Sequence, residues 1–392
     1  MRALPPGAFD GVKVIELSGP LGGYCGKLFA DLGADVILVE PPEGDDARHR
    51  PPLTAEGESL WFAYHNANKR GVVHDPAKDT AAIESLLSTA HILIGNGSAS
   101  WPAAWGLSLE ELRQRHPSLV IVSLTPFGLT GPYSSYEATD LVCLAMGGLL
   151  ALGGYGDGSP LQVAGDQAFN AVALFGAVGA ALALLHAESA GVGQIVDASA
   201  QEAIAMALEH AIQYYDLVGT VRGRQTGRQR GAGAGLYRCA DGWLYLFVGG
   251  IASGRFWTRF VEWMLEERVT GADELTGSAW DDRAYFETDE AKSTFLRVFE
   301  AFSGTRGMEE LYREAQARGI AAAPVRAPSG VVASAQLAMR EYFQPITTPM
   351  GREVLAPGAP YTFSETPWVQ RCPVPRLGEH TGLIDREVGG HD

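Results

Sequence analysis

The sequence predicts an α/β protein, with an open, mainly parallel sheet in a large domain and a smaller α+β domain. Across the first 200 residues, apolar β-branched segments alternate with helical segments, which is typical of parallel strands joined by helical crossovers. The predicted strands are 12–17, 35–40, 71–74, 91–94 and 119–124. Further on, Asp241-Gly242 lies between β-rich flanks, which predicts a hairpin, and amphipathic helices follow from about 254 to 318.

Composition and charge limit which macromolecules the chain can bind and in which cellular compartment it is expected. The chain of 392 residues carries a formal net charge of −16, which argues against nucleic acid or an anionic membrane as a general partner. The N-terminus lacks the apolar core of a signal peptide, and the four cysteines form no C-x-x-C pair, so a reduced, cytoplasmic setting is expected. No metal-ligand cluster is visible, and neither a metal nor a permanently bound cofactor is expected. The cysteines are Cys25, Cys143, Cys239 and Cys372.

A long apolar segment of small residues, 171–185, is the centre of the large domain. Its 15 residues are fewer than the ~18 that indicate a membrane span, so a core helix is predicted. Small residues recur on one face at helical spacing and would let another backbone approach closely: Gly176, Ala180, Ala183 and Ala187.

Asp166 stands where this helix should begin. A carboxylate at that position can accept hydrogen bonds from free backbone amides and is favoured by the helix dipole. Two interpretations remain open from the residues alone. Asp166 is either an ordinary N-cap or an ionised nucleophile or base.

A glycine-containing loop, SGPLGGYCG, joins the first strand to the first helix. This βαβ pattern invites a dinucleotide-binding interpretation. The spacing is wrong, however, because Leu21 occupies the place of the first glycine in G-x-G-x-x-G.

Several segments together resemble a known family. They are GDQAFNAVALFGAVGAALALLHAESAGVGQIVD, FADLGADVILVEPPEGDDAR and TPFGLTGPY. They are similar to the class III CoA-transferases, the family of formyl-CoA transferase and carnitine CoA-transferase, which also includes the α-methylacyl-CoA racemases. The likeness extends from residue 11 to about 390. It implies a Rossmann-like sheet in the large domain and a homodimer whose two chains interlock.

The resemblance implies that Asp166 is a covalent nucleophile. CoA would then move from an acyl-CoA thioester to a free carboxylic acid, through an aspartyl–acyl anhydride and an aspartyl-CoA thioester. The racemases carry a His-Asp pair where this chain has Thr139-Asp140, and Thr cannot exchange a proton at neutral pH. Asp140 is either a supporting carboxylate or a cap for a helix over 141–150. Racemisation, and a non-catalytic acyl-CoA-binding subunit of a heteromer, are the alternatives.

The resemblance also implies contacts to CoA, which would be a substrate. One basic residue of the segment around Lys69 and Arg70 would lie near the phosphates, whereas Arg48 is either a ligand contact or a solvated surface charge. A glycine loop including Gly249 and Gly250 would shield the intermediate. The remaining predicted contacts are Gly19, Pro20, Leu21, Asn96 and Gly97.

The resemblance also implies the domain boundaries. Residues 1–216 are expected to form the large domain, completed by 345–392. A linker over 217–234 leads to the small domain at 235–327, and a return linker covers 328–344.

Overall fold

The computed structural model describes residues 5–75, 78–224, 227–249 and 253–389. The chain divides into two compact units, which we describe separately. Unit 1 contains residues 1–153, 161–222 and 335–392, and unit 2 contains 154–160 and 223–334. The C-terminal part of the chain thus returns to unit 1.

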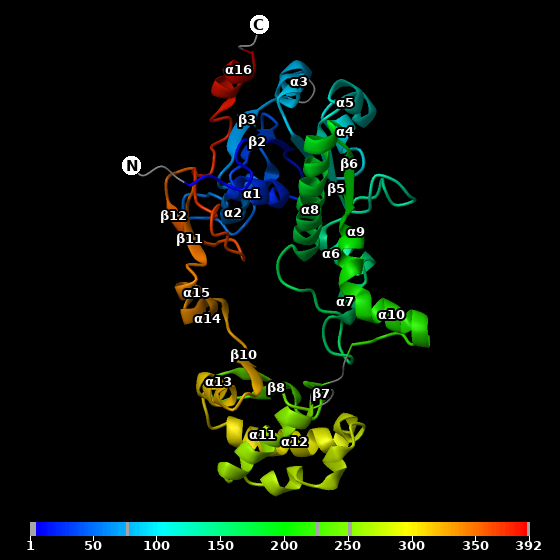
Figure 1. Ribbon diagram of the computed structural model, residues 1–392, viewed down its shortest axis with the longest axis vertical. Helices are drawn as coiled ribbons and strands as arrows, with labels where there is room; N and C mark the ends of the chain where they lie inside the picture. Colours follow the sequence, from blue (N-terminus) through cyan, green and yellow to red (C-terminus); the bar gives the residue numbers. More distant parts are fainter. Residues whose placement is uncertain (1–4, 76–77, 225–226, 250–252, 390–392) are drawn as a thin grey trace. The chain divides into compact units, whose positions relative to one another are not determined.

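Unit 1 is built on a six-stranded sheet in the order β3-β2-β1-β4-β5-β6, with every neighbouring pair parallel. The predicted parallel α/β fold is therefore confirmed. Nearly all side chains of the central strands are buried, as expected when helices cover both faces. The strands, coloured blue to green in Figure 1, are β1 (Lys13–Leu17), β2 (Asp35–Glu40), β3 (Arg70–Val73), β4 (Ile92–Asn96), β5 (Val120–Thr125) and β6 (Ile195–Ser199).

Alternate residues of the strands supply two separate cores. Val14 and Val122 pack with α1 (Tyr24–Asp31), α6 (Asp140–Met146) and α8 (Gln167–Ala190). Ile15 and Ile121 face the other way, toward a second group of helices. That group comprises α3 (Thr80–Ser88), α4 (Trp101–Ala104), α5 (Leu109–Arg115) and α16 (Thr381–Gly389).

The predicted core helix is α8. A Cβ atom at Gly176 would lie 2.4 Å from the Leu124 side chain of β5, so glycine lets the helix approach the sheet closely. Among the described residues, α8 is the one helix long and apolar enough to span a membrane, but half of its most apolar window is buried inside unit 1. The packing of this face against β5 and α1 identifies it as a core helix.

Three predicted helices differ from the structure. The helix expected over 141–150 is split into α6 and α7 (Leu149–Leu152), because Gly148 adopts a φ of +87° between them. The sequence SAQE at 199–202 is a helix-start pattern, and the apolar pattern that follows it is divided among α9 (Ala200–Ala205), a 3₁₀ turn η2 (Met206–Leu208) and α10 (Glu209–Val218). Asp75-Pro76 is also a helix-start pattern, but α3 begins at Thr80, since Asp79 takes the N-cap position and its carboxylate accepts from the Asp75 amide.

The C-terminal segment completes unit 1. A hairpin of β11 (Phe343–Thr347) and β12 (Glu353–Pro357) packs on α2 (Leu60–Asn66). The Asn68 side-chain oxygen accepts from the amides of Arg371 and Cys372, at 2.7 and 3.2 Å. Beyond it, the His380 ring accepts from the Gly71 amide of β3 at 3.1 Å. A short helix, α15 (Ala335–Met339), precedes the hairpin.

Unit 2 is a small α+β unit, as predicted. Its antiparallel sheet has the order β10-β9-β8-β7, and the Asp241-Gly242 turn joins β8 to β9. The core is rich in aromatic side chains, including Phe260, Trp263 and Phe299. The elements are β7 (Gln229–Gly231), β8 (Ala234–Arg238), β9 (Trp243–Phe247), β10 (Ala321–Pro324), α11 (Ser253–Glu266), α12 (Asp289–Ser303), α13 (Met308–Ala317), α14 (Pro328–Val332) and the 3₁₀ turns η3 (Ala272–Leu275), η4 (Ser278–Asp281) and η5 (Tyr285–Glu287).

Candidate active site

Asp166 occupies the N-cap position of α8, but its carboxylate caps nothing. It makes no side-chain hydrogen bond to the first turn of the helix. Instead, Oδ1 accepts from Arg50 Nη2 at 2.6 Å and Oδ2 accepts from Trp61 Nε1 at 2.9 Å. The side chain is 17% exposed. The two oxygens are therefore held by one charged donor and one neutral donor, and solvent still reaches the group.

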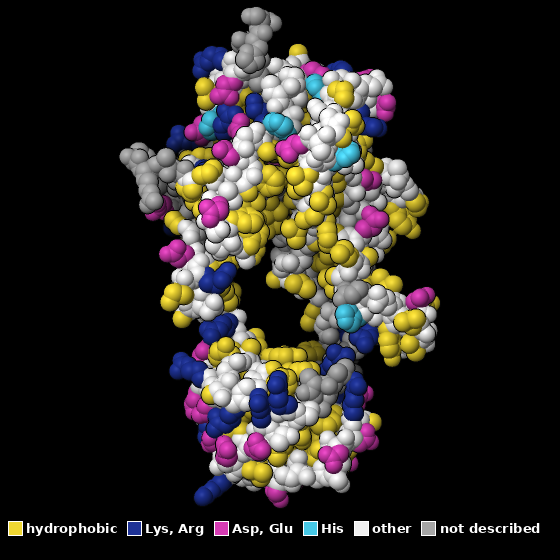
Figure 2. Space-filling model, in the orientation of Figure 1, with side chains coloured by type: hydrophobic (Ala, Val, Ile, Leu, Met, Phe, Trp, Pro, Cys, Tyr) yellow, Lys and Arg dark blue, Asp and Glu magenta, His cyan; other side chains and the backbone are white. Residues whose placement is uncertain are grey.

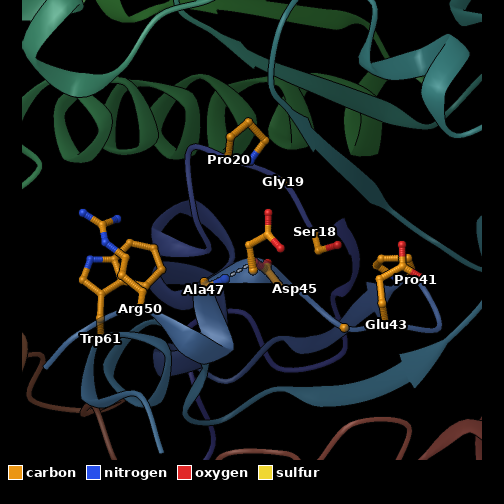
Figure 3. A pocket seen from close by; sticks show the side chains of 11 residues that line it. Ser18, Gly19, Pro20, Pro41, Glu43, Asp45, Ala47, Arg50 and Trp61 are labelled. Atoms are coloured by element: carbon orange, nitrogen blue, oxygen red, sulfur yellow. Dashed lines mark hydrogen bonds between the residues drawn. The ribbon is translucent and has the colours of Figure 1, made fainter. Parts of the chain in front are cut away.

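Arg50 and Trp61, the two donors to Asp166, stack on each other. The guanidinium lies over the indole ring, 4.4 Å from its centroid (Figure 3). Arg50 follows the 3₁₀ turn η1 (Asp46–His49), and Trp61 lies in the first turn of α2. Ser59 ties the two segments together, because its hydroxyl donates to the Arg50 carbonyl and accepts from the Phe62 amide. Neither residue was predicted from the sequence, because no motif in this irregular stretch marks them.

His65 and Gly22 fix the Trp61 ring. The His65 ring packs against it in a tilted arrangement, with the centroids 4.0 Å apart and the planes at 31°, and His65 Nδ1 bonds to the Trp61 carbonyl at 2.8 Å. Burial lowers the pKa of His65 to about 4, so the imidazole is neutral near pH 7. Gly22 has a φ of +81°, and a Cβ there would lie 2.3 Å from the indole.

Asp140 supplies the cap that Asp166 does not. Its Oδ1 accepts from the Phe169 amide, in the first turn of α8, at 2.9 Å. Its Oδ2 is buried and has no partner among the described residues. Burial, together with the nearby Asp166 charge, raises the pKa of Asp140. Asp140 thus serves α8 and lies in the first turn of α6, and its role in the chemistry stays a prediction.

A pocket of about 520 Å³ lies beside Arg50 and Trp61. It is formed by the loops that follow β1 and β2, where an open parallel sheet usually binds its ligand. Arg50 is the sole cation among its lining residues, all of which the structure describes, beside three carboxylates. Burial raises the pKa of one of them, Asp45, to about 6. The lining, drawn in Figure 3, comprises Ser18, Gly19, Pro20, Pro41, Glu43, Gly44, Asp45, Asp46, Ala47, Arg50 and Trp61.

The predicted CoA contacts of the β1–α1 loop divide into two groups. Gly19 and Pro20 line the pocket, whereas Leu21 is 4% exposed and packs in the core. Asn96 lies behind the loop, where its side chain accepts from the Leu21 amide at 3.0 Å and donates to the Leu17 carbonyl. Gly97 is adjacent to Pro20. Asn96 therefore supports the loop from behind.

Among the predicted cationic contacts, Lys69 is fully buried. Its ammonium pairs with Glu16 and also donates to the Gly23 carbonyl and to Asn66, both at 2.8 Å. All three of its protons are used within the protein. Lys69 therefore supports the β1–α1 loop in this structure, and its contact with CoA phosphate stays a prediction.

Arg48 and Arg70 are also paired. The Arg48 guanidinium binds both oxygens of Glu40, at 2.7 and 2.6 Å, and lies over Phe62. Arg70 bridges Asp35 and Glu387 at the edge of the sheet. Neither side chain lines the 520 Å³ pocket.

Of the two glycines named for the predicted loop, the structure describes Gly249, which lies in unit 2. Gly249 lines a small pocket of about 110 Å³ with Arg230, Phe247 and Arg283. A Cβ at Gly249 would lie 1.9 Å from the Ala232 carbonyl, so close packing requires glycine there. Gly250 lies outside the described residues. Among those residues, no group of three or more His, Cys, Asp or Glu could hold a metal ion.

The sequence model of the family described as CoA-transferase family III matches residues 9–381. This chain belongs to CoA-transferase family III. It is 39% identical to succinyl-CoA:(R)-benzylsuccinate CoA-transferase subunit BbsE of Thauera aromatica, over 97% of this chain and 94% of that protein. It is 30% identical to succinate–glutarate CoA-transferase of Agrobacterium fabrum, over 98% and 96% of the two chains.

The fold agrees with this membership. A crystal structure of a CAIB/BAIF family protein from Brucella suis matches with a TM-score of 0.82 and 26% identity, over 98% of this chain and all of that one. The chain is therefore an enzyme of acyl-CoA metabolism, a CoA-transferase that moves CoA between acids.

Proposed function

We propose that Asp166 is the nucleophile of this CoA-transferase. The observation that carries the proposal is the state of its carboxylate. It stands at the start of α8 without capping it, is held by Arg50 and Trp61, and is partly exposed beside a pocket. The guanidinium at 2.6 Å fixes the orientation of the carboxylate through a charge-assisted hydrogen bond.

The reaction proceeds by exchange at two carbonyl carbons. The Asp166 carboxylate attacks the donor thioester, the C–S bond breaks, and CoA leaves as thiolate from a mixed anhydride. The thiolate attacks the Asp166 carbonyl carbon and expels the donor acid as carboxylate, leaving an aspartyl-CoA thioester. The acceptor carboxylate then repeats these steps in reverse and restores Asp166. Each step exchanges groups of similar energy, as covalent catalysis requires.

Trp61 is the neutral donor that we assign to the oxyanions formed on Asp166 in these steps. Its N–H already donates to Asp166 Oδ2, whereas the Phe169 amide at the start of α8 donates to Asp140. A fixed neutral donor that meets developing negative charge lowers the barrier without reorganisation.

The relatives suggest which substrates to test first. Both relatives described above carry succinyl-CoA or succinate, and a second dicarboxylic acid, in their names. We take succinyl-CoA as the first donor and (R)-benzylsuccinate and glutarate as the first acceptors. Loops that tolerate change line the pocket, so the acyl specificity has to be measured.

The test of the nucleophile is the Asp166→Ala variant. It should lose transfer from succinyl-CoA while still binding CoA, whereas the wild type should show the mass of CoA on the peptide that contains Asp166. The matched control is Asp289→Ala, which removes an exposed carboxylate from the first turn of α12. Turnover retained in Asp166→Ala would end the assignment.

The racemase alternative has its own test. With Thr139 at the place of the second base, exchange of the α-hydrogen should not occur. A chiral 2-methylacyl-CoA is incubated in D₂O without any acceptor acid. Deuterium at the α-carbon would favour racemisation over transfer.

We further propose a cytoplasmic homodimer. Apolar side chains are exposed on α8 and α10, among them Leu182 at 64% and Leu217 at 81%. Figure 2 shows hydrophobic side chains gathered over α10. Such a face favours burial against a partner. Sedimentation and activity of the chain expressed alone test this, because a dimer active by itself would also exclude a non-catalytic subunit of a heteromer.

A further inference from the structure

Among the residues that the structure describes, Arg50 has one ion-pair partner, Asp166. Its Nη2 donates to Asp166 Oδ1 at 2.6 Å, its plane stacks on Trp61, and 39% of its side chain remains exposed to the pocket. A guanidinium presents five N–H donors in a fixed fork. The hydrogen bond to Asp166 uses only one side of that fork.

The proposed chemistry removes this partner. When Asp166 is an anhydride or a CoA thioester, its carboxylate charge is gone. Trp61 loses little, because a neutral N–H can still donate to the remaining carbonyl oxygen. Arg50 cannot release its proton, so its positive charge is left beside a neutral group.

The other described acids near Arg50 make no ion pair with it in this structure. Glu40 holds Arg48 with both oxygens, Asp45 accepts from the Ala47 amide, and Asp140 accepts from the Phe169 amide. The structure gives Arg50 no bond to Glu43 or Asp46, the two remaining acids of the described pocket lining. The incoming substrate, a carboxylate, has the matching charge and the planar geometry for a guanidinium.

We propose that Arg50 binds the reacting carboxylate of the acceptor acid after Asp166 has been acylated. This inference rests on the proposed function. Arg50 exchanges one carboxylate for another, from Asp166 in the free enzyme to the acceptor acid in the aspartyl-CoA state. An acid held by Arg50 lies next to the Asp166 carbonyl carbon, since the guanidinium stands 2.6 Å from the oxygen on that carbon.

The bonds balance with no further reactant. One acceptor oxygen forms a bond to the Asp166 carbonyl carbon, the C–S bond breaks, and CoA leaves as thiolate. The thiolate then attacks the acceptor carbonyl carbon of the anhydride. The C–O bond to Asp166 breaks and acyl-CoA forms. The restored Asp166 carboxylate then accepts the hydrogen bond from Arg50 again.

This change of the carboxylate bound by Arg50 also determines the order of the two half-reactions. In the free enzyme Arg50 is held by Asp166, so a free acid binds weakly. In the aspartyl-CoA state Arg50 is available, so the same acid binds well. The released donor acid should use the same site in the reverse direction, and its product inhibition should depend on Arg50.

The test separates formation of the adduct from its discharge. The protein is loaded with succinyl-CoA alone, and the CoA adduct on the Asp166 peptide is quantified by mass spectrometry. The adduct is then discharged with increasing glutarate or (R)-benzylsuccinate. Arg50→Gln removes the positive charge. Arg50→Lys keeps the positive charge but lacks the planar set of guanidinium donors. Arg115→Gln, which removes a half-exposed ion-paired arginine remote from the pocket, is the matched control.

We expect Arg50→Gln to form the adduct but to need about 10- to 100-fold more acceptor for half-maximal discharge, with inhibition by succinate weakened in parallel. Arg50→Lys should lie between Arg50→Gln and the wild type, and Arg115→Gln should match the wild type. Discharge by Arg50→Gln at wild-type acceptor concentrations would overturn the inference and leave the nucleophile in place. Absence of any adduct on the wild-type protein would overturn both.

Discussion

The carboxylate of Asp166 is held by residues far from it in the sequence. Arg50 lies 116 positions away and Trp61 lies 105. An Asp at a helix start would ordinarily bond to the first backbone amides. Here Asp140 takes the Phe169 amide, which leaves Asp166 to its two side-chain donors. Because Asp140 caps α8, the Asp166 carboxylate at the N-cap position is available for the nucleophilic role that we propose.

The Trp61→Phe variant should measure what the neutral N–H donor contributes to catalysis. It removes the N–H that meets Asp166 Oδ2 but keeps a ring for Arg50 and His65 to stack on. Loss of one oxyanion donor typically costs about 100- to 1000-fold in kcat, and we expect a decrease of at least tenfold here. Steady-state kcat with succinyl-CoA measures it. An unchanged kcat would show that Trp61 only packs.

His65 should make stability depend on pH. Its pKa is lowered from 6.5 to about 4 by burial, so between these values the unfolded chain binds a proton that the folded chain does not. The free energy of unfolding therefore falls as pH decreases through this window, by about 1.4 kcal/mol per pH unit and on the order of 3 kcal/mol in total.

Urea unfolding of the wild type and of His65→Phe between pH 4 and 7 tests this. The variant keeps a stacked ring and should lose that part of the slope. His49→Phe, at an exposed position, is the control and should keep it. Equal slopes for all three proteins would contradict the assignment to His65.

Sequence reasoning could select Asp166 as a candidate site residue, but it could not predict the side chains that bond to its carboxylate. A glycine-aspartate pair before an apolar helix is a local pattern, whereas Arg50 and Trp61 act through contacts that only the fold creates. Lys69 and Arg70 show the same limit. They are adjacent cations in the sequence, yet one is fully buried against Glu16 and the other bridges Asp35 and Glu387 at the edge.

At the scale of elements, the β1–α1 loop connects the sheet to the site. Asn96 bonds to it from β4, and the buried Lys69 bonds to its Gly23 carbonyl. Gly22 brings this loop against the Trp61 ring. The loop therefore sets the position of a donor to Asp166 without touching the carboxylate itself.

Gly22→Ala should disturb the site through this contact. The new Cβ would lie 2.3 Å from the indole, so the ring must move and its N–H must leave Asp166. Alanine at positive φ also costs about 1–2 kcal/mol. Gly11→Ala is the matched control, because Gly11 has a similar φ of +85° and nothing within 4 Å of the Cβ position.

Both variants should lose a similar amount of stability by thermal unfolding from the backbone alone. Only Gly22→Ala should lose kcat, by tenfold or more. A similar loss of kcat in Gly11→Ala would show that backbone strain, and not the displaced ring, is responsible.

Elements with a strong local pattern were predicted well. The segment 35–40 is β2, and Ser108 and Ser199 cap α5 and α9 as their sequences indicate. The break within 141–150 was not predicted, because the apolar periodicity continues through it. It occurs at Gly148, which has a φ of +87° and where a Cβ would lie 2.7 Å from the Leu208 side chain.

The whole molecule contains two units with separate cores. The unit 2 core includes Trp263 and Phe299, both with 0% exposure, and no side chain of the unit 1 cores. Separate cores open as separate cooperative units. Phe299→Ala should therefore destabilise unit 2 by about 3–5 kcal/mol and leave unit 1 nearly unchanged.

Native-state hydrogen exchange tests this separation. In Phe299→Ala, the amides of β8, β9 and α12 should lose protection, while those of β1, β4 and β5 keep it. A uniform loss across both units would show that they unfold together.

At this scale, the sequence analysis predicted a parallel sheet and a small α+β unit, and both are confirmed. Alternation of strands and helices is enough to indicate the class. The order β3-β2-β1-β4-β5-β6 is not contained in that alternation, because each strand pattern is compatible with several neighbours. The contacts that close unit 1, such as Asn68 with the 371–372 backbone, likewise have no local signature.

The late return of the chain to unit 1 has a consequence for synthesis on the ribosome. Residues 335–392 carry the hairpin and the helix that bond to β3 and α2, and they emerge last. Unit 2 is fully translated by then, so we expect it to fold first, while unit 1, which contains Asp166, is still incomplete. A chain truncated after residue 334 and released from the ribosome should yield a protease-resistant fragment from unit 2 only.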